Sequence, residues 1–454
     1  MEASANYYGQ TTLHPVGLAA VLILGVALVL LPRRFSVYPM IVMASFISSA
    51  QRVVISGLDF DLLRILVLFA WARVLSRNEF KGFLWNRLDS LLLAWMASGT
   101  IVYTLQQGTS SAFINRCGWM FVGLGLYFFF RCVLRDWQDL EHLVISFIVV
   151  SIPVAMAFAV EWATGRNAFS VFGGVPEITL VREGKFRCQG AFAHAILAGC
   201  FWASVMPLMV PFLVERRRWF AVVGLLASLF IVVASSSSTP VMAVIFGAAG
   251  MAFYPLRSHL RPIRYGFFAI LVVLHFIMKG PVWSLIARIS AVAGSTGWHR
   301  YSIMDATIRN FEKWWLLGEP DPMSWGVWEM RDITNQYILE GLQGGLLTLV
   351  LFIAGISTAF TMVGKALRQV ESQPQERLLV FTVGVSLFVH VWSYFGVSYF
   401  GQILMLWYLT LAIVGSLDRM SGNEQPYSED GGDPGFLEGR PYGPSYGGGL
   451  RKSV

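Results

Sequence analysis

Arg182, Lys185 and Arg187 place three basic side chains within six residues of one another. The planar guanidinium of arginine binds phosphate oxygens through paired hydrogen bonds and keeps its charge at neutral pH. If this stretch lies at a membrane surface, we expect Arg182 and Arg187 to hold a lipid-linked diphosphate. Attraction to anionic lipid headgroups is the alternative explanation for these charges.

His194 follows the basic stretch at the start of a predicted helix, after Gly190 and Phe192. The first backbone amides of a helix point their N–H groups outward and favour negative charge. We therefore predict that this helix start adds positive potential toward the phosphate. The alternative for His194 is that its imidazole only packs against neighbouring side chains.

A second basic stretch, residues 281–332, also carries aromatic side chains. Its basic residues include Arg288, His299, Arg300, Arg309, Lys313 and Arg331, and it holds six of the sixteen Trp residues. Such a segment can bind anions and stack on sugars, although Trp at a membrane surface more often serves as an interface anchor. We expect a helix from His299 to Trp315 along the membrane surface, with Arg300 facing the same site as Arg187.

Ionisable residues also occur within apolar segments. Arg64 is predicted two turns into one helix, three residues after Asp61, and Glu340 two turns into another. Ionisable groups at such depth line cavities by default, so Arg64 is a candidate substrate-binding residue. A local pair with Asp61 is the alternative. His275 and His390 have no partner spacing, and we expect them to be packing residues.

The elements that must position these residues are membrane-spanning helices. Of the 454 residues, 56% are apolar and 13% charged, about half the ~25% charge of soluble proteins. Mean hydropathy is +0.59. Apolar runs of helical length predict an all-α polytopic membrane protein and exclude an ordinary soluble enzyme. We predict thirteen segments: 16–31, 37–50, 58–75, 88–105, 117–134, 141–162, 190–213, 219–235, 239–254, 265–280, 333–362, 378–396 and 399–417.

The basic residues predict which connections face the cytoplasm. Pairs such as Arg33 with Arg34, Arg73 with Arg77, and Arg131 with Arg135 fall on alternate connections, as the positive-inside rule requires. This topology places the N-terminus and the two long loops, 163–189 and 281–332, outside. The segment 37–50 is short for a span. If it is re-entrant, the count becomes twelve and the N-terminus moves inside.

The predicted transmembrane domain covers residues 1–420 and is followed by a tail. Residues 421–454 contain nine Gly and four Pro with few apolar side chains, too few to bury a core. We expect a disordered cytoplasmic tail that the chemistry does not need.

Several site classes are missing from the sequence. Cys117, Cys132, Cys188 and Cys200 form no CxxC pair and are expected to be free thiols. No HExxH motif, external carboxylate pair or phosphate-binding P-loop occurs. We therefore expect neither a metal site nor a cofactor, and the basic residues serve topology rather than nucleic-acid binding.

Four sequence pieces resemble the O-antigen ligase-like family, which includes lipopolysaccharide ligases and Wzy-type polysaccharide polymerases. Its RxxGxFxHPI signature resembles the run from Arg187 through Gly190, Phe192 and His194 to Ile196. Three further pieces follow in the family's order, within about residues 180–350: Ser235 to Pro240, Arg300 with Ala306 and Gly318, and Asp332 to Tyr337 followed by Gly344 and Gly345.

The resemblance implies a membrane glycosyltransferase of the GT-C-like class, at the external face of a bacterial inner membrane. Its donor would be a glycan on undecaprenyl diphosphate, and its acceptor a second lipid-linked glycan. Arg187 and Arg300 would stabilise the leaving diphosphate, with His194 as a further catalytic candidate. Substrate contacts are expected from Arg182, Lys185, Arg288, His299, Asp332, Asn335 and Arg64. A chain-length regulator and a flippase of the same pathway are expected partners.

One departure from the family pattern favours a polymerase. The ligases place a His immediately before the Asn of the last motif, where this chain has Thr334. A hydroxyl cannot act as a general base near neutral pH, so His194, His299 or Asp332 would have to supply one. Two alternatives stay open: a ligase that transfers the glycan to another acceptor, and a transporter or flippase of lipid-linked saccharide. A membrane O-acyltransferase is a remote alternative that His275 and His390 do not support.

Overall fold

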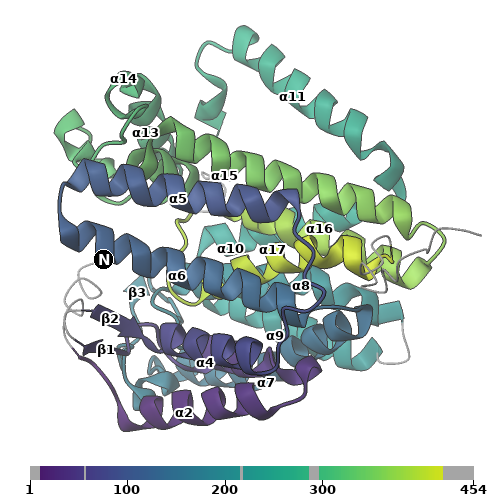
Figure 1. The fold of residues 1–454 in the computed structure, drawn as a ribbon. Coiled ribbons are helices and arrows are strands. Elements are labelled where there is room, and N and C mark those ends of the chain that lie inside the picture. The colour runs from purple at the N-terminus through teal and green to yellow at the C-terminus, as the bar shows by residue number, and fades with distance from the viewer. Residues whose placement is uncertain (1–10, 56–57, 215–217, 286–295, 423–454) are drawn as a thin grey trace, which may run out of the picture. The chain divides into compact units, whose positions relative to one another are not determined.

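The computed structural model describes residues 11–55, 58–214, 218–285 and 296–422, and it is built almost wholly of helices (Figure 1). About 75% of the described residues are helical. Arg288 and residues 423–454 lie outside the described residues. The principal helices are α2 (Pro15–Leu30), α3 (Tyr38–Phe46), α4 (Leu62–Ser76), α5 (Arg87–Gln107), α6 (Ser110–Val133), α7 (Trp137–Thr164), α8 (Ala195–Met209), α9 (Arg218–Ala234), α10 (Ser238–Ala252), α11 (Leu260–Ile277), α13 (Thr296–Arg309), α14 (Phe311–Trp314), α15 (Gln336–Gln369), α16 (Pro374–Ser393) and α17 (Ile403–Met420).

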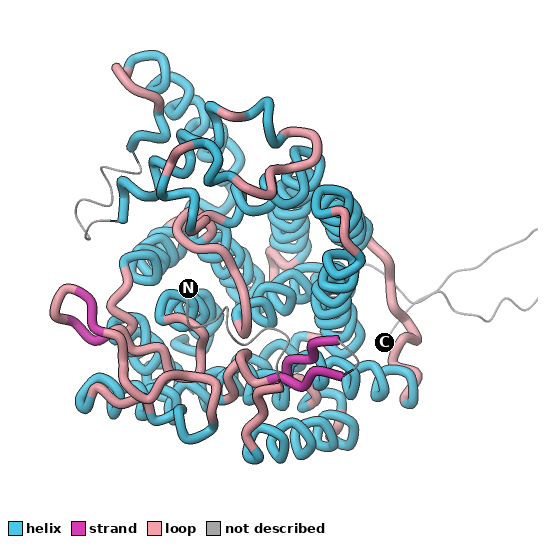
Figure 2. Tube along the Cα trace, turned by 90° about the vertical axis from the view of Figure 1, so that its left-hand side faces the viewer, coloured by secondary structure: helices cyan, strands magenta, loops and turns pink. Residues whose placement is uncertain are grey.

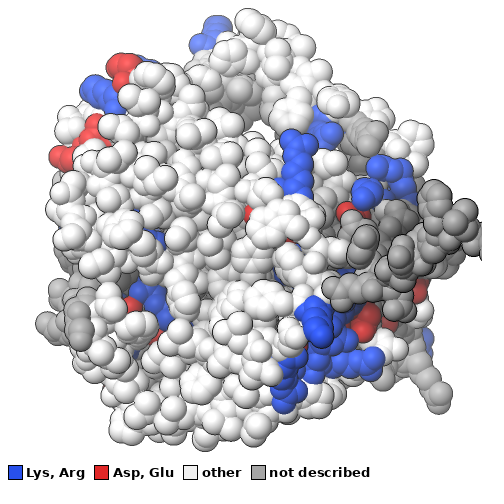
Figure 3. All heavy atoms as spheres, viewed as in Figure 1, with Lys and Arg blue, Asp and Glu red and all other residues white. Residues whose placement is uncertain are grey.

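The predicted polytopic membrane protein is confirmed at the level of its helices. Within the described residues, seven helices are long and apolar enough to cross a membrane: α5, α6, α7, α8, α15, α16 and α17. Four shorter apolar helices lie at α2, α9, α10 and α11. Figure 3 shows an almost uncharged band across the middle of one face, with charged side chains toward both ends.

The segment 37–50 forms the nine-residue helix α3. At 1.5 Å per residue it spans about 13 Å, well short of a ~30 Å hydrocarbon core. This helix alone is therefore too short to cross the membrane, and the re-entrant alternative for this segment stays open.

Two short hairpins depart from the all-helical prediction. Strands β1 (Arg52–Ile55) and β2 (Leu58–Asp61) pair, and so do β3 (Val181–Arg182) and β4 (Lys185–Phe186). Residues 58–61 are therefore strand and not the start of a span. As a consequence Arg64 is the third residue of α4, and its predicted depth of two turns is wrong. Glu340 is likewise only the fifth residue of α15, about one turn in.

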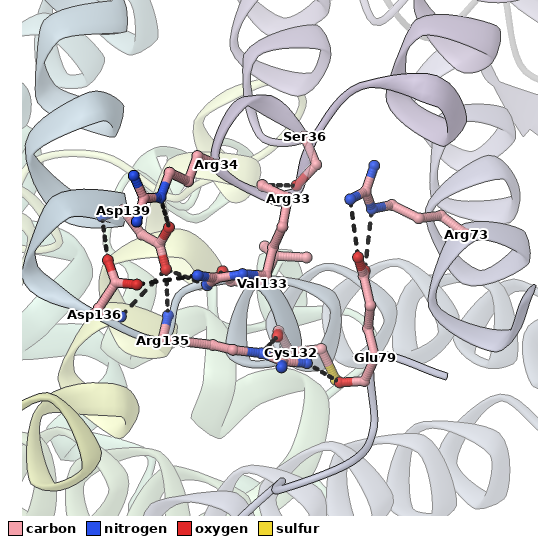
Figure 4. Close-up of polar contacts among 10 residues, drawn as sticks. All are labelled: Arg33, Arg34, Ser36, Arg73, Glu79, Cys132, Val133, Arg135, Asp136 and Asp139. Carbon is pink, nitrogen blue, oxygen red and sulfur yellow. Dashed lines mark hydrogen bonds and ion pairs between the residues drawn. The ribbon is translucent and has the colours of Figure 1, made fainter. Parts of the chain in front are cut away.

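Ion pairs fasten the helices at the end predicted to face the cytoplasm (Figure 4). Arg33 pairs with Asp136 at 3.0 Å and also with Asp139. Buried Arg73 donates to both carboxylate oxygens of Glu79, at 2.8 and 3.0 Å. In Figure 3, Lys and Arg gather at this right-hand end. Arg33 and Arg73, which the positive-inside rule assigns to the cytoplasmic side, therefore also form ion pairs within the protein.

Figure 2 looks onto the opposite end, which carries both hairpins and the α13–α14 segment. Gly345 interrupts α15 there, with φ 69° and ψ −177°. A Cβ at this position would lie 2.4 Å from the carbonyl oxygen of Leu316, so only glycine allows the approach. The Leu346 amide donates to the Trp315 carbonyl at 2.7 Å. This break in α15 lets residues 315–316 of the long 281–332 segment pack against the helix bundle.

Candidate functional site

Arg187 lies in the segment between β4 and α8, and only 7% of its surface is exposed. One of its terminal nitrogens, Nη2, donates to the hydroxyl of Ser237 at 2.9 Å, whereas its Nε has no hydrogen-bond partner among the described residues. No carboxylate in the described part of the chain pairs with it. Burial, reinforced by the nearby charge of Arg182, lowers the pKa of Arg187. Among the described residues, the hydrogen-bond partner of the Arg187 guanidinium is therefore a neutral hydroxyl and not a carboxylate.

Glu161, in the last turn of α7, orders the segment that presents Arg187. This buried carboxylate accepts hydrogen bonds from the Gln189 and Gly190 amides, both at 3.0 Å, and from the Thr179 hydroxyl at 3.1 Å. The Cys188 amide, meanwhile, donates to Ala234 at the end of α9. Sequence reasoning missed Glu161, although a carboxylate inside an apolar segment was a signal that could have found it.

Arg300 reaches the same place from α13, more than a hundred residues later in the chain. Its Nη2 donates to the Thr239 hydroxyl at 2.7 Å, and its guanidinium carbon lies against Gly396. Burial lowers the pKa of Arg300 as well. Like Arg187, it has no carboxylate partner within the described residues.

The two arginines therefore converge on the start of α10. Their acceptors, Ser237 and Thr239, are two residues apart, so the Cα atoms of these acceptors lie within about 7 Å of each other. Ser237 caps the helix with extended backbone, and its hydroxyl makes no cap hydrogen bond. The first amides of α10 add positive potential to the two guanidinium charges. This arrangement is suited to a dianionic or more highly charged ligand.

A second helix start faces the same region. His194 caps α8, and its Nδ1 accepts the Ile196 amide at 3.2 Å. Close packing of α8 on α10 is visible at Gly199, where a Cβ would lie 2.5 Å from Pro240. Burial, with help from the charge of Arg187, lowers the pKa of His194 to about 4. The imidazole is thus neutral at neutral pH.

The hydrogen bond by which His194 caps α8 determines which ring nitrogen carries the proton. Because Nδ1 accepts a backbone N–H, the neutral ring carries its hydrogen on Nε2 and presents a donor. This geometry suits a hydrogen bond to an anion and does not suit a general base.

The remaining predicted residues of the last motif lie around the start of α15. His299, next to Arg300, places Nε2 3.1 Å from the Asp332 carbonyl oxygen. A carbonyl can only accept, so Nε2 carries the hydrogen and Nδ1 is left able to accept a proton. Asn335 caps α15 through the Ile338 amide, and the Thr334 hydroxyl is buried with no hydrogen-bond partner among the described residues.

The structure does not bring every predicted residue into this cluster. Arg182 and Lys185 are exposed on the β3–β4 hairpin, where Arg182 is 3.8 Å from Glu183. Arg64 belongs to a separate cavity and pairs with Asp61 at 3.7 Å, as the alternative interpretation predicted. His390 is buried and bonds to the Tyr399 hydroxyl at 3.0 Å, in keeping with a packing role.

Comparison with protein-family models finds no match to this chain, and comparison with curated proteins finds none. The resemblance to the O-antigen ligase-like family stays a prediction that rests on the motif residues.

Proposed function

We propose that the protein is a polysaccharide polymerase that joins undecaprenyl-diphosphate-linked oligosaccharide repeat units. We place it in a bacterial inner membrane with its active loops outside, and with a GT-C-like arrangement of 12 to 13 spans. The observation that supports this proposal is the convergence of buried Arg187 and half-buried Arg300 on the first turn of α10, with no carboxylate partner for either among the described residues. At the opposite end, buried Arg73 has a carboxylate partner in Glu79.

The chemistry needs a site for a departing diphosphate. In the reaction, an acceptor hydroxyl oxygen attacks the anomeric carbon while the bond from that carbon to the diphosphate oxygen breaks. Negative charge grows on the leaving diphosphate, and attack from the opposite face inverts the anomeric centre. Arg187 and Arg300 would bind that charge, with the Nε2–H of His194 as a further donor. The hydroxyl proton would pass to a base, for which His299 Nδ1 offers a free acceptor.

The test begins with deletion of the gene and mass-spectrometric sizing of the lipid-linked glycans that accumulate. Single repeat units on the carrier lipid are the result expected for a polymerase. Long polymers stranded on the lipid would instead indicate a ligase, and absence of accumulation on the outer leaflet would indicate a transporter. Either of these results would overturn the proposal.

Complementation then tests the residues. Arg300→Ala is expected to lower product formation by a factor of about 10² to 10³, the usual effect of removing one transition-state charge donor. Arg300→Lys should also be poor because the paired hydrogen-bond geometry is lost. Arg309→Ala is the matched control, since Arg309 lies on the same helix and is exposed and paired with Asp305 at 2.6 Å. Full activity of Arg300→Ala at normal protein level would refute the assigned site.

A further inference from the structure

Two arginines at the end predicted to face the cytoplasm have no carboxylate partner among the described residues. Arg135, in the connection between α6 and α7, donates to the backbone carbonyls of Cys132 at 2.8 Å and Glu79 at 2.6 Å (Figure 4). Arg419 lies in the last turn of α17, and its side chain makes no hydrogen bond to any described residue. Both arginines lie at the opposite end of the bundle from the proposed glycan site.

The charges that act on Arg419 are mostly of its own sign. Those of Arg135, Arg33 and Arg131 repel it, and the carboxylate of Asp139 attracts it. Like charges held close together in a partly buried place are unfavourable unless an anion lies among them. An anion of suitable size would therefore be attracted to this group of arginines.

The carboxylates of this region already have other partners. Asp136 and Asp139 form the capping box at the start of α7, and both pair with Arg33. Asp139 also accepts the backbone amide of Arg135 at 2.8 Å. The other two nearby carboxylates pair with other arginines: Glu79 with Arg73, and Asp89 with Arg131. Arg135 and Arg419 are therefore left without a neutralising charge among the described residues.

The guanidinium groups of the two arginines are accessible to a ligand. Both residues are half-buried. The polar atoms that are enclosed and unpartnered include no nitrogen of Arg419 and no nitrogen of Arg135. The guanidinium nitrogens of Arg419 and Nη1 of Arg135 have no hydrogen bond to a described residue, so each retains accessible surface. A ligand can therefore contact them from outside the bundle.

The surface next to these arginines has the character of a membrane interface. The connection from α4 to α5 passes beside Arg419, where a Cβ on Gly82 would lie 3.5 Å from Nη2. Three residues later, Trp85 is 56% exposed and stacks on Phe128 at a centroid distance of 5.7 Å. Exposed Trp rings mark the headgroup level of a bilayer. The anion present at this level is the phosphate of a phospholipid headgroup, which accepts paired hydrogen bonds from guanidinium groups.

We propose that Arg135 and Arg419 form a binding site for an anionic phospholipid, whose phosphodiester oxygens accept hydrogen bonds from both guanidinium groups. Basic pockets between the ends of transmembrane helices bind such headgroups in other membrane proteins. Two unneutralised arginines match the two phosphodiesters of cardiolipin better than the single one of phosphatidylglycerol. The inference does not depend on the glycan chemistry proposed for the opposite end.

The test uses the full-length protein in phosphatidylcholine nanodiscs that contain cardiolipin as a minor component. Native mass spectrometry of the released protein measures how far each bound lipid is enriched over its share in the nanodisc. We expect cardiolipin to be enriched about tenfold or more, the equivalent of at least about 1.4 kcal/mol. Phosphatidylglycerol in its place should be enriched less. Cardiolipin should also raise the thermal midpoint of the wild-type protein, because it binds the folded state.

Arg419→Gln removes one of the two charges. It should reduce cardiolipin enrichment about tenfold, the equivalent of one hydrogen bond to a charged group of about 1.5 kcal/mol. Its thermal midpoint in pure phosphatidylcholine should not fall, because the side chain has no hydrogen bond to a described residue to lose. Arg264→Gln is the matched control, since Arg264 is an exposed arginine on α11 outside this cluster, and it should leave enrichment unchanged.

Arg419→Glu provides a second variant. It places a carboxylate beside Arg135, so it should abolish cardiolipin enrichment while the protein stays folded in phosphatidylcholine.

Three results would overturn the inference. The first is wild-type protein that enriches neither cardiolipin nor phosphatidylglycerol, and the second is an equal loss of enrichment in Arg419→Gln and Arg264→Gln. The third is a lower thermal midpoint of Arg419→Gln in pure phosphatidylcholine, which would make Arg419 a structural residue. Inorganic phosphate serves as the soluble probe. If it raises the midpoint in pure phosphatidylcholine as far as cardiolipin does, the site binds a soluble anion and the lipid assignment fails.

Discussion

Replacing Arg187 with Met should abolish product formation without destabilising the protein. Arg187 is 7% exposed, and among the described residues its side chain makes one hydrogen bond, to Ser237. One hydrogen bond to a charged group contributes about 1.5–3 kcal/mol, whereas burying a charge costs several kcal/mol. After the substitution Ser237 keeps its hydrogen bond to the Ser235 carbonyl at 3.1 Å, so no new unpaired group appears. The net change should therefore range from neutral to a gain of about 1–3 kcal/mol.

Arg73→Met is the matched control for that prediction. Arg73 is fully buried, and its guanidinium contacts both oxygens of Glu79 and the carbonyls of Leu28 and Leu31. Its removal leaves the buried Glu79 carboxylate without this partner, which should cost about 3–5 kcal/mol. Thermal unfolding of both variants in the same nanodiscs, beside product formation in cells, measures the contrast. If Arg187→Met lowers the unfolding midpoint as far as Arg73→Met does, Arg187 is a structural residue and the reasoning fails.

Three further perturbations test other parts of the structure. Glu161→Gln should lower the unfolding midpoint and product formation together, because an amide oxygen replaces a carboxylate that accepts three hydrogen bonds; normal values of both would contradict its role in ordering the Arg187 segment. His194 has a folded pKa of about 4 against about 6.5 unfolded, so the unfolded state binds more protons between these values. Stability should therefore fall by up to about 1.4 kcal/mol per pH unit between pH 6.5 and 4, and His194→Asn, which keeps a capping oxygen, should lose this contribution in unfolding curves recorded across the range. Deletion of residues 421–454 should leave product formation near normal, and loss of product with the protein still inserted would show that the tail is needed.

The apolar runs in the sequence were sufficient to predict most of the helices. Burial in lipid requires long stretches of apolar side chains, and these stand out without any partner. The segment 37–50 is an exception, because it is apolar but forms a helix of only nine residues, α3. Residues 58–61 were misassigned to a helix, although their Leu-Asp-Phe-Asp sequence alternates with the period of two that indicates a strand. Pairing with β1 confirms the strand.

The candidate site was predictable in its residue types and not in its geometry. Arg187 and Arg300 stand out in the sequence as cations on segments predicted to lie outside. Their convergence depends on the α8–α10 packing at Gly199 and on the break at Gly345, which brings the 281–332 segment back to the bundle. Neither contact leaves a periodic pattern in the sequence. The proton position of His194 was likewise decided only by the folded backbone, which brings the Ile196 amide to Nδ1, because hydrogen bonding depends on where partners lie in space.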